Sequence, residues 1–279
     1  MTDSIDRPLL PLADARHGLR ADCSRCAGLC CVAPAFAASA DFAIDKPAGV
    51  PCPKLAGDLG CSIHAELRDL GMPGCAVFDC FGAGQQVVQR TFAGRHWRDS
   101  PETAAEVFAV FPVVRQLAEL RWYLAEALSR LDPGPLREEV ERAERATEAQ
   151  VAASAADLLA FDAPAHRRQV GPLLDRVSRA VRAGALGRDR SGADLVGRDL
   201  RRTGLRGASL RGAYLIGADL RGADLSLTDL LGADLRAADV RGARLADALF
   251  LTQPQVEAAV GDGATTLPVA LVRPRHWAG

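Results

Sequence analysis

Residues 193–252 read, in blocks of five, ADLVG RDLRR TGLRG ASLRG AYLIG ADLRG ADLSL TDLLG ADLRA ADVRG ARLAD ALFLT. The third residue of a block is Leu ten times, with Val240 and Phe250 as the exceptions, and the first is Ala nine times. A period of five fits neither an α-helix, which repeats every ~3.6 residues, nor a flat strand, which repeats every second residue. It predicts a solenoid whose coil has short straight sides and a turn at each corner.

The segment resembles the pentapeptide-repeat proteins, whose pattern is A-(D/N)-L-x-x. The resemblance implies a right-handed, four-sided β-helix with four blocks per coil, so the twelve blocks of 193–252 make three coils. It also implies that the first and third residues of each block point inward, where Leu fills the axis and Ala fits the narrow corners. We therefore expect the axial leucines to be buried, namely Leu200, Leu205, Leu210, Leu215, Leu220, Leu225, Leu230 and Leu235.

Residues 20 apart should stack directly over one another in such a coil. One face then carries a column of aspartates beside a column of arginines: Asp199, Asp219 and Asp239 with Arg201, Arg221 and Arg241. The arginines offset the repulsion among the aspartates. Two further faces carry outward apolar residues: Val196, Tyr214 and Ile216 on one, and Leu231, Leu249 and Leu251 on the other. Apolar clusters that point outward are usually contact surfaces, so we expect each to pack against other parts of this chain or against a partner.

Residues 101–186 are helical in character. Ser100 is a candidate N-cap before Pro101, and apolar residues then recur at a helical period, with Pro112 expected to kink or divide the helix. A second helix is predicted over about 136–159, and a third ends near Gly184. We expect the third helix to cap the solenoid at its N-terminal end, and a short helix after Thr252 to cap the other end.

The length of 279 residues favours two or three domains. The apolar fraction of 48% and charged fraction of 25% are ordinary for a globular protein and exclude global disorder and a collagen-like fibre. The predicted domains are a cysteine-rich metal-binding domain (1–100), a helical hairpin or bundle (101–186), the solenoid (187–252) and a capping helix with tail (253–279). The fold class is therefore α+β and multidomain. No segment has the basic excess of a nucleic-acid-binding protein.

All eight cysteines lie between Cys23 and Cys80. The N-terminus resembles no secretory signal and no stretch is apolar enough to span a membrane, so we expect a cytoplasmic protein. In a reducing compartment, clustered cysteines favour metal ligation over disulfides or free redox thiols. The spacing C-x2-C lets one loop present two thiolates to one ion, whereas the adjacent Cys30 and Cys31 should serve different ions, or one of them none.

The cysteine segment resembles a second family, the putative zinc- or iron-chelating cysteine-cluster proteins. The matching motifs are CSRCAGLCC, CPKL, GCSI and CAVFDC within residues 22–81, although GMPGC lacks the Arg-Pro that commonly precedes its cysteine. The resemblance implies metal binding by Cys23, Cys26, Cys30, Cys31, Cys52, Cys61, Cys75 and Cys80. All-cysteine ligation suits zinc and iron–sulfur clusters equally. His64 is read as a surface residue rather than a ninth ligand.

These features favour a non-enzymatic metal-binding protein whose solenoid is a scaffold for a protein partner. The alternative is an iron–sulfur redox protein or oxidoreductase, although neither a catalytic base nor a substrate motif stands out. A topoisomerase-protecting DNA mimic, known among pentapeptide-repeat proteins, is less favoured, because nine arginines balance the eight aspartates of 193–252. We expect no membrane contact and no nucleic-acid partner.

Overall fold

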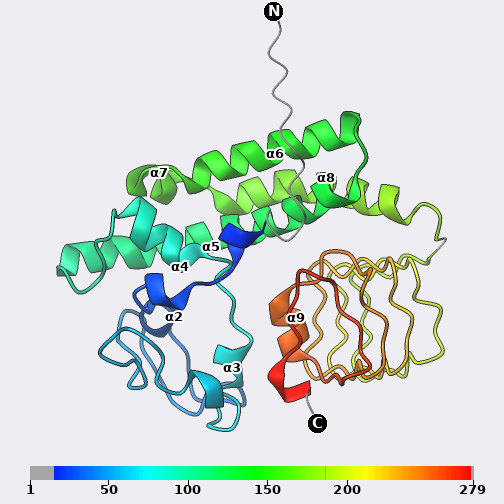
Figure 1. The fold of residues 1–279 in the computed structure, drawn as a ribbon, viewed down its shortest axis with the longest axis horizontal. Coiled ribbons are helices and arrows are strands. Elements are labelled where there is room, and N and C mark those ends of the chain that lie inside the picture. The colour runs from blue at the N-terminus through cyan, green and yellow to red at the C-terminus, as the bar shows by residue number, and fades with distance from the viewer. Residues whose placement is uncertain (1–15, 186, 278–279) are drawn as a thin grey trace, which may run out of the picture.

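The computed structural model describes residues 16–185 and 187–277, so expectations that concern residues 1–15 lie outside the described residues. Figure 1 shows loops with short helices up to residue 100, a layer of long helices, and a stack of coils. The helical layer lies over the other two parts, and the cysteine-rich loops lie beside the C-terminal end of the stack. The exact domain boundaries stay a prediction.

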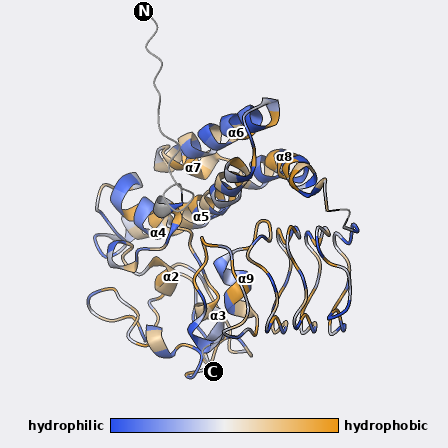
Figure 2. Ribbon diagram, turned by 45° about the vertical axis from the view of Figure 1, so that its right-hand side comes forward, coloured by the Kyte–Doolittle hydropathy of each residue, from blue (hydrophilic) through white to orange (hydrophobic). Residues whose placement is uncertain are grey.

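The helical layer consists of α5 (Pro101–Arg130), α6 (Pro135–Val151), α7 (Ala155–Ala160) and α8 (Ala163–Arg182). The last three all pack against α5. The N-cap of α5 is confirmed, because the Ser100 hydroxyl accepts a hydrogen bond from the Thr103 N–H at 3.2 Å. Helix α6 is largely hydrophilic (Figure 2) and buries only a narrow stripe that includes Val140 and Val151.

Two expectations about these helices are not met in full. Of the two outcomes expected at Pro112, a kink or a division, the division is wrong, because α5 runs on as one helix. Its side chain is exposed, so the carbonyl left without a donor lies on the solvent side, where water can satisfy it. The helix expected over 136–159 is broken after Val151, because Ser154 caps a new helix by accepting from the Asp157 N–H at 3.2 Å.

The remaining helices are short. They are η1 (His17–Leu19), η2 (Cys23–Arg25), α2 (Leu29–Val32), η3 (His64–Glu66), α3 (Pro73–Ala76), α4 (Ala83–Gln86), η4 (Val87–Thr91), α9 (Gln253–Ala258) and η5 (Arg275–Trp277). No helix in the described ranges combines the length and apolar character needed to cross a membrane.

The repeat segment stacks with the expected register. Parallel bridges join residues 20 apart, as from Asp199 to Asp219 and from Asp219 to Asp239. Each bridge is one residue long, and the described residues form no longer strand. The expected burial is confirmed, since the eight axial leucines from Leu200 to Leu235 are at most 4% exposed. The chain turns at block ends with positive φ, which favours glycines such as Gly222 (φ 65).

The stack extends beyond the twelve blocks at both ends. Asp189 bridges Ser209, so the block RDRSG at 188–192 belongs to the first coil and places Arg190 where other blocks have Leu. At the other end, Val260 bridges Asp239 and a further bridge joins residues 244 and 266. The predicted solenoid, 187–252, includes the first of these blocks although Arg190 replaces its axial leucine. The prediction missed the C-terminal part, because α9 interrupts the period.

Helix α8 does not cap the first coil, contrary to the prediction. It runs above the stack in Figures 1 and 2, and the Arg182 guanidinium donates to the Gly207 carbonyl at 2.9 Å. Helix α9 lies at the opposite end of the stack. There the Gln255 side-chain amide donates to the carbonyls of Leu230 (2.8 Å) and Ala233 (2.9 Å).

The helical layer is fastened to the last coils by a buried polar group. The Glu126 carboxylate on α5 accepts from the Phe250 N–H at 2.9 Å and from the Arg16 guanidinium at 3.1 Å. Tyr123 packs edge-on against the Phe250 ring. Of the two outward apolar clusters, the one containing Leu249 and Leu251 is therefore buried by this chain's own parts.

Candidate metal centre

The first cysteines are positioned by contacts between residues 20–31 and α4. Cys23 lies in η2 and Cys26 follows it, while Asp22 donates its N–H to the Gln85 side chain at 3.0 Å. The Cα of Gly84 lies so close that an added Cβ would stand 2.6 Å from the Cβ of Cys26. Cys80 lies three residues before the start of α4, and its carbonyl accepts from the Ala83 N–H at 2.9 Å. Cys23, Cys26 and Cys80 are thereby held together at the base of the helical layer.

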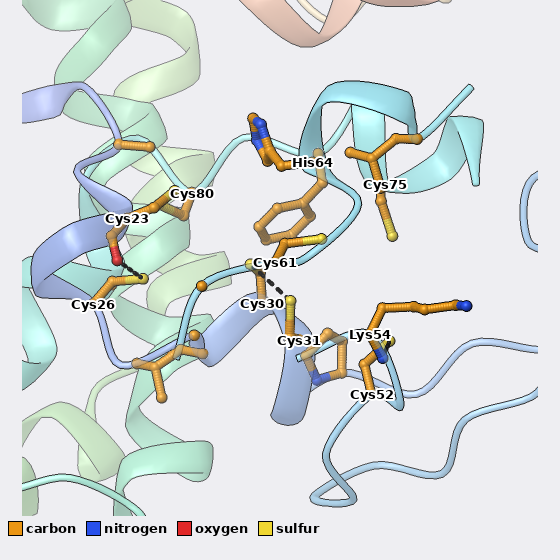
Figure 3. Close-up of a pocket in the computed structure, with 18 of the residues that line it drawn as sticks. Cys23, Cys26, Cys30, Cys31, Cys52, Lys54, Cys61, His64, Cys75 and Cys80 are labelled. Carbon is orange, nitrogen blue, oxygen red and sulfur yellow. Dashed lines mark hydrogen bonds between the residues drawn. The ribbon is translucent and has the colours of Figure 1, made fainter. Parts of the chain in front are cut away.

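A tight hairpin brings the middle cysteines to α2. Leu55 forms an antiparallel bridge with Cys61, and the Ser62 N–H donates to the Lys54 carbonyl at 2.9 Å. Cys52 donates its N–H to the carbonyl of Cys31 at 2.9 Å. Cys52 and Cys61 therefore lie next to Cys31, and Cys75 on α3 faces them across an open space (Figure 3).

All eight cysteines line one cavity of about 530 Å³. Its remaining wall is mostly apolar and includes Phe36, Phe42, Phe78 and Phe111. None of the eight forms a disulfide. The fold thus collects thiols that are spread over 58 positions, from Cys23 to Cys80, around a single space.

The sulfurs surround this space rather than meet at a point. The Sγ atoms of Cys30 and Cys31 are 4.0 Å apart, and Cys26 Sγ lies 3.5 Å from the Cys23 carbonyl oxygen. Within residues 16–185 and 187–277, no three Cys, His, Asp or Glu side chains are arranged closely enough to hold an ion as they stand. Metal binding by the eight cysteines remains a prediction.

The thiols influence one another's ionisation. The hydrogen bond with Cys23 lowers the pKa of Cys26 to about 6 and raises that of Cys23. The hydrogen bond between Cys30 and Cys31 likewise lowers the pKa of Cys31 and raises that of Cys30. Burial raises the pKa of Cys75 to about 11. Cys26 and Cys31, whose pKa values are lowered, are therefore the thiols of these two pairs that ionise more readily.

Lys46 is a buried residue of the site that the sequence reasoning did not single out. It is 3% exposed, and its Nζ donates to the carbonyls of Val32 (2.8 Å), Pro47 (3.0 Å) and Val50 (3.0 Å). Burial lowers its pKa, and the charges of Cys52, Cys31 and Cys75 oppose that shift. Its only signal in the sequence is that lysine occurs just twice, at Lys46 and Lys54.

His64 is exposed at the start of η3 and stands at the edge of the same cavity. It lies beyond the hairpin that carries Cys61 (Figure 3). The structure therefore agrees with its reading as a surface residue, and its closeness to the thiols makes it a useful control position.

Comparison with known proteins identifies the repeats. The family model described as pentapeptide repeats matches residues 191–226 and 213–250, with eight copies of the repeat. This chain is a pentapeptide-repeat protein. It belongs to one family with the uncharacterized protein YybG of Bacillus subtilis (strain 168), to which it is 53% identical over 266 residues, or 94% of this chain and 95% of YybG.

Two solved pentapeptide-repeat proteins are similar to part of the chain. One, from the thylakoid lumen of Arabidopsis thaliana, is 32% identical over 30% of this chain and 57% of its own length, with a TM-score of 0.22. The other, Rfr23 from the cyanobacterium Cyanothece 51142, is 29% identical over 32% of this chain and 51% of its own length, with a TM-score of 0.19. The matched region spans about half of each solved chain.

Proposed function

We propose that this pentapeptide-repeat protein binds metal through its cysteine cluster and presents its solenoid, a right-handed four-sided β-helix, as a scaffold for a protein partner. The observation that carries the proposal is the convergence of all eight cysteines, from separate loops, on one cavity. Cysteines that served only to fill a hydrophobic core would be scattered through the domain and would not all line one cavity.

The donor set fits a soft metal. Thiolates are the preferred ligands of zinc and of iron–sulfur clusters. Two thiolates on a tetrahedral zinc ion, with bonds of about 2.3 Å, stand roughly 3.8 Å apart. The thiols of the cavity would have to approach to such distances to share an ion. Modest rotations about the side-chain bonds would bring further thiols inward, and the bound metal would then supply folding energy to the loops.

An iron–sulfur redox protein is the alternative that the cavity supports. The phenylalanines of its wall would shield a cluster from water. Solvent exposure is one of the factors that set the reduction potential of an iron–sulfur cluster. The same eight thiols would serve as ligands in either case, so the identity of the metal decides between the two functions. A reducing compartment such as the cytoplasm would keep these thiols available.

The scaffold role rests on what the helices leave uncovered. Val196 and Tyr214 are 52% and 54% exposed, whereas the cluster with Leu249 and Leu251 is covered by α5. Tyrosine is enriched where proteins meet. We propose this face, with Ile216 beside it, as the contact for a protein partner.

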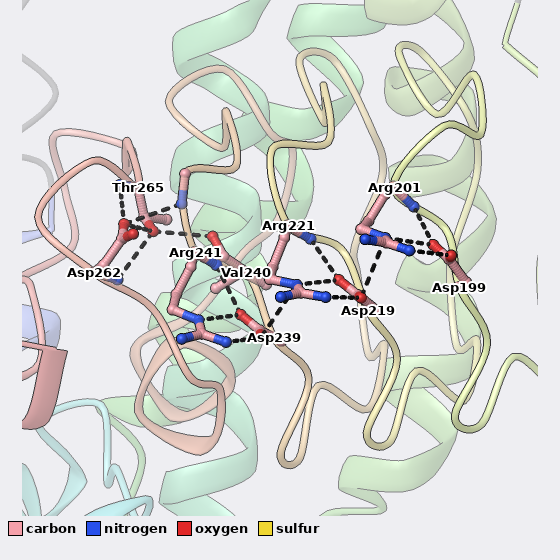
Figure 4. Close-up of polar contacts among 10 residues, drawn as sticks. Asp199, Arg201, Asp219, Arg221, Asp239, Val240, Arg241, Asp262 and Thr265 are labelled. Atoms are coloured by element: carbon pink, nitrogen blue, oxygen red, sulfur yellow. Dashed lines mark hydrogen bonds and ion pairs between the residues drawn. The ribbon is translucent and has the colours of Figure 1, made fainter.

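A DNA mimic receives less support from the charges. In the column shown in Figure 4, Asp199, Asp219 and Asp239 each pair with the arginine two residues later, at 2.5–2.7 Å. A surface on which each aspartate is neutralised by its neighbour does not imitate the row of unpaired phosphates on DNA.

Purification under reducing conditions, in the presence and absence of air, tests the proposal. Elemental analysis should find zinc or iron bound to the protein, and a visible spectrum separates the two outcomes. A colourless protein with zinc supports the scaffold function. A brown protein absorbing near ~400 nm, a property of iron–sulfur clusters, supports the redox alternative. A folded protein without metal would refute both.

A further inference from the structure

We propose that the cavity contains two separate four-thiolate sites, an inner site formed by Cys23, Cys26, Cys30 and Cys80 and an outer site formed by Cys31, Cys52, Cys61 and Cys75. This inference rests on the proposed metal binding and specifies how the ligands are shared. It follows from which segments of the backbone are joined around each half of the cavity.

The inner site belongs to the helical side of the domain. Cys23 and Cys26 are tied to α4 through Gln85, whose amide also donates to the Arg20 carbonyl at 2.7 Å. Cys80 lies three residues before the start of the same helix, and its carbonyl accepts from the Ala83 N–H at 2.9 Å. The contact of Gly84 with Cys26 leaves no side chain between these thiols and α4. Three of the four inner ligands therefore move as one unit with the helices.

The outer site belongs to the loops. The Cys52 N–H is bound to the Cys31 carbonyl, and the 54–62 hairpin carries Cys61 over the same point. Cys75 is held there because Gly74 donates its N–H to the Asp41 carbonyl at 2.9 Å. Figure 3 shows the side chains of Cys31, Cys52, Cys61 and Cys75 around one half of the space and those of Cys23, Cys26 and Cys80 around the other.

Cys30 and Cys31 divide between the two sites because they are neighbours on α2. Successive side chains on a helix point about 100° apart. In Figure 3 the Cys30 side chain lies on the side of Cys26 and the Cys31 side chain on the side of Cys52. Cys30 therefore belongs to the inner site and Cys31 to the outer site. With this division each site has the four ligands that zinc and iron–sulfur clusters usually require.

Lys46 provides independent support for an anionic outer site. Its buried ammonium contacts three backbone carbonyls and pairs with no carboxylate in the described part of the chain. One of these carbonyls belongs to Val32, the residue after Cys31. A buried charge is costly unless an opposite charge lies nearby. Four thiolates around a divalent ion carry a net negative charge, which supplies the missing counter-charge.

Zinc stoichiometry tests this division. The chain is reduced, stripped of metal, reloaded with zinc ions alone and counted by native mass spectrometry. The wild type should hold two zinc ions. Cys23→Ser with Cys30→Ser removes ligands from one site and should leave one zinc ion. Cys23→Ser with Cys31→Ser removes one ligand from each site. This second double variant should hold fewer zinc ions than the first double variant, approaching none. The two double variants differ only by adjacent residues, so they are matched controls.

A measurement on the wild type covers the case in which a variant does not fold. Graded addition of a chelator should populate chains with one zinc ion between those with two and those with none. A single zinc ion in the wild type, loss of both ions in one step, or equal losses in the two double variants would overturn the division while leaving metal binding intact. A wild type that takes up no zinc and no iron would instead refute the proposed function itself.

Discussion

At the scale of single residues, the axial leucines of the solenoid differ from the surface arginines next to them. We expect Leu220→Ala to destabilise the protein by about 2–5 kcal/mol, because it leaves a cavity in a close-packed axis where Leu220 has no exposed surface. Arg221→Ala should change stability little, because its ion pairs with Asp219 and Asp239 are exposed to solvent. Denaturant unfolding of both variants measures the contrast.

The adjacent positions make this comparison internally controlled. Both substitutions lie in the same coil and end in the same residue, so differences in chain composition are small. Equal losses of stability would contradict the assignment of inward and outward positions.

A second residue-scale prediction concerns the buried pair of Arg16 and Glu126. Both are at most 5% exposed, and the carboxylate also accepts from the Phe250 N–H. Glu126→Ala should cost about 3–5 kcal/mol, because it leaves a buried guanidinium and a buried N–H without a partner. The unfolding free energy in denaturant is the measurement.

The matched double variant separates the charge from the packing. Arg16→Met together with Glu126→Met removes both charges and keeps apolar volume, so it should be more stable than Glu126→Ala. If the double variant loses as much stability as the sum of its single variants, the pair is not coupled and the interpretation of this contact fails.

At the scale of elements, the column of aspartates and arginines predicts how the solenoid responds to acid. The hydrogen bond from Arg201 lowers the pKa of Asp199 to about 2, and those from Arg221 and Arg241 lower the pKa of Asp219 and Asp239. An unfolded aspartate titrates near ~3.9. The contribution of these pairs is therefore complete above about pH 4 and is lost as pH falls through the folded values toward about 2.

Thermal unfolding between pH 7 and pH 2 checks this expectation. The melting temperature should lose the contribution of the column only below about pH 4. Arg221→Gln should make that acid loss smaller. Arg202→Gln serves as the control, because Arg202 lies beside the column and forms no ion pair in the described residues. Identical acid profiles for the two variants would show that the column does not contribute.

The repeat could be predicted from sequence because each block repeats the same packing requirement. The buried axis follows from the apolar residue at every fifth position, whereas the 20-residue register follows from the four blocks per coil that the resemblance to pentapeptide-repeat proteins implies. The C-terminal end could not, because α9 interrupts the period before the chain returns to the stack at Val260. The break before α7 depended on the cap at Ser154, which a helical pattern of Ala and Glu conceals.

The cysteine site was predicted in its composition but not in its arrangement. Spacing alone identifies thiols that can share a loop, such as Cys23 and Cys26. It cannot show that Cys80, just before α4, lies next to Cys23 and Cys26, or that the Cys52 N–H donates to the Cys31 carbonyl, since both contacts depend on the tertiary fold. Lys46 was not predicted either, because a lysine that directly follows Asp45 in a loop gives no sign in the sequence that it is buried.

At the scale of the whole molecule, the three parts should differ in their dependence on metal. Residues 22–81 are rich in loops and poor in large apolar side chains, and so small a unit usually needs metal or disulfides to fold. The stack has its own continuous leucine axis with no cysteine in it. In the described residues, the contacts between the N-terminal part and the C-terminal end of the stack include part-buried bonds from Arg20 to the Ala270 carbonyl and from Arg68 to Glu257.

Removal of metal should therefore unfold the cysteine-rich loops and leave the solenoid and helices folded. Hydrogen exchange followed by mass spectrometry, with and without a chelator under reducing conditions, measures protection along the chain. We expect protection to fall over residues 22–81 and to persist around Leu220, because metal-binding energy is folding energy only where the ligands lie. Cys23→Ser should reproduce without chelator the part of this loss that lies around Cys23, Cys26 and Cys80, whereas His64→Ala should not. Uniform loss along the chain, or full protection of 22–81 in protein shown to be free of metal, would contradict this dependence.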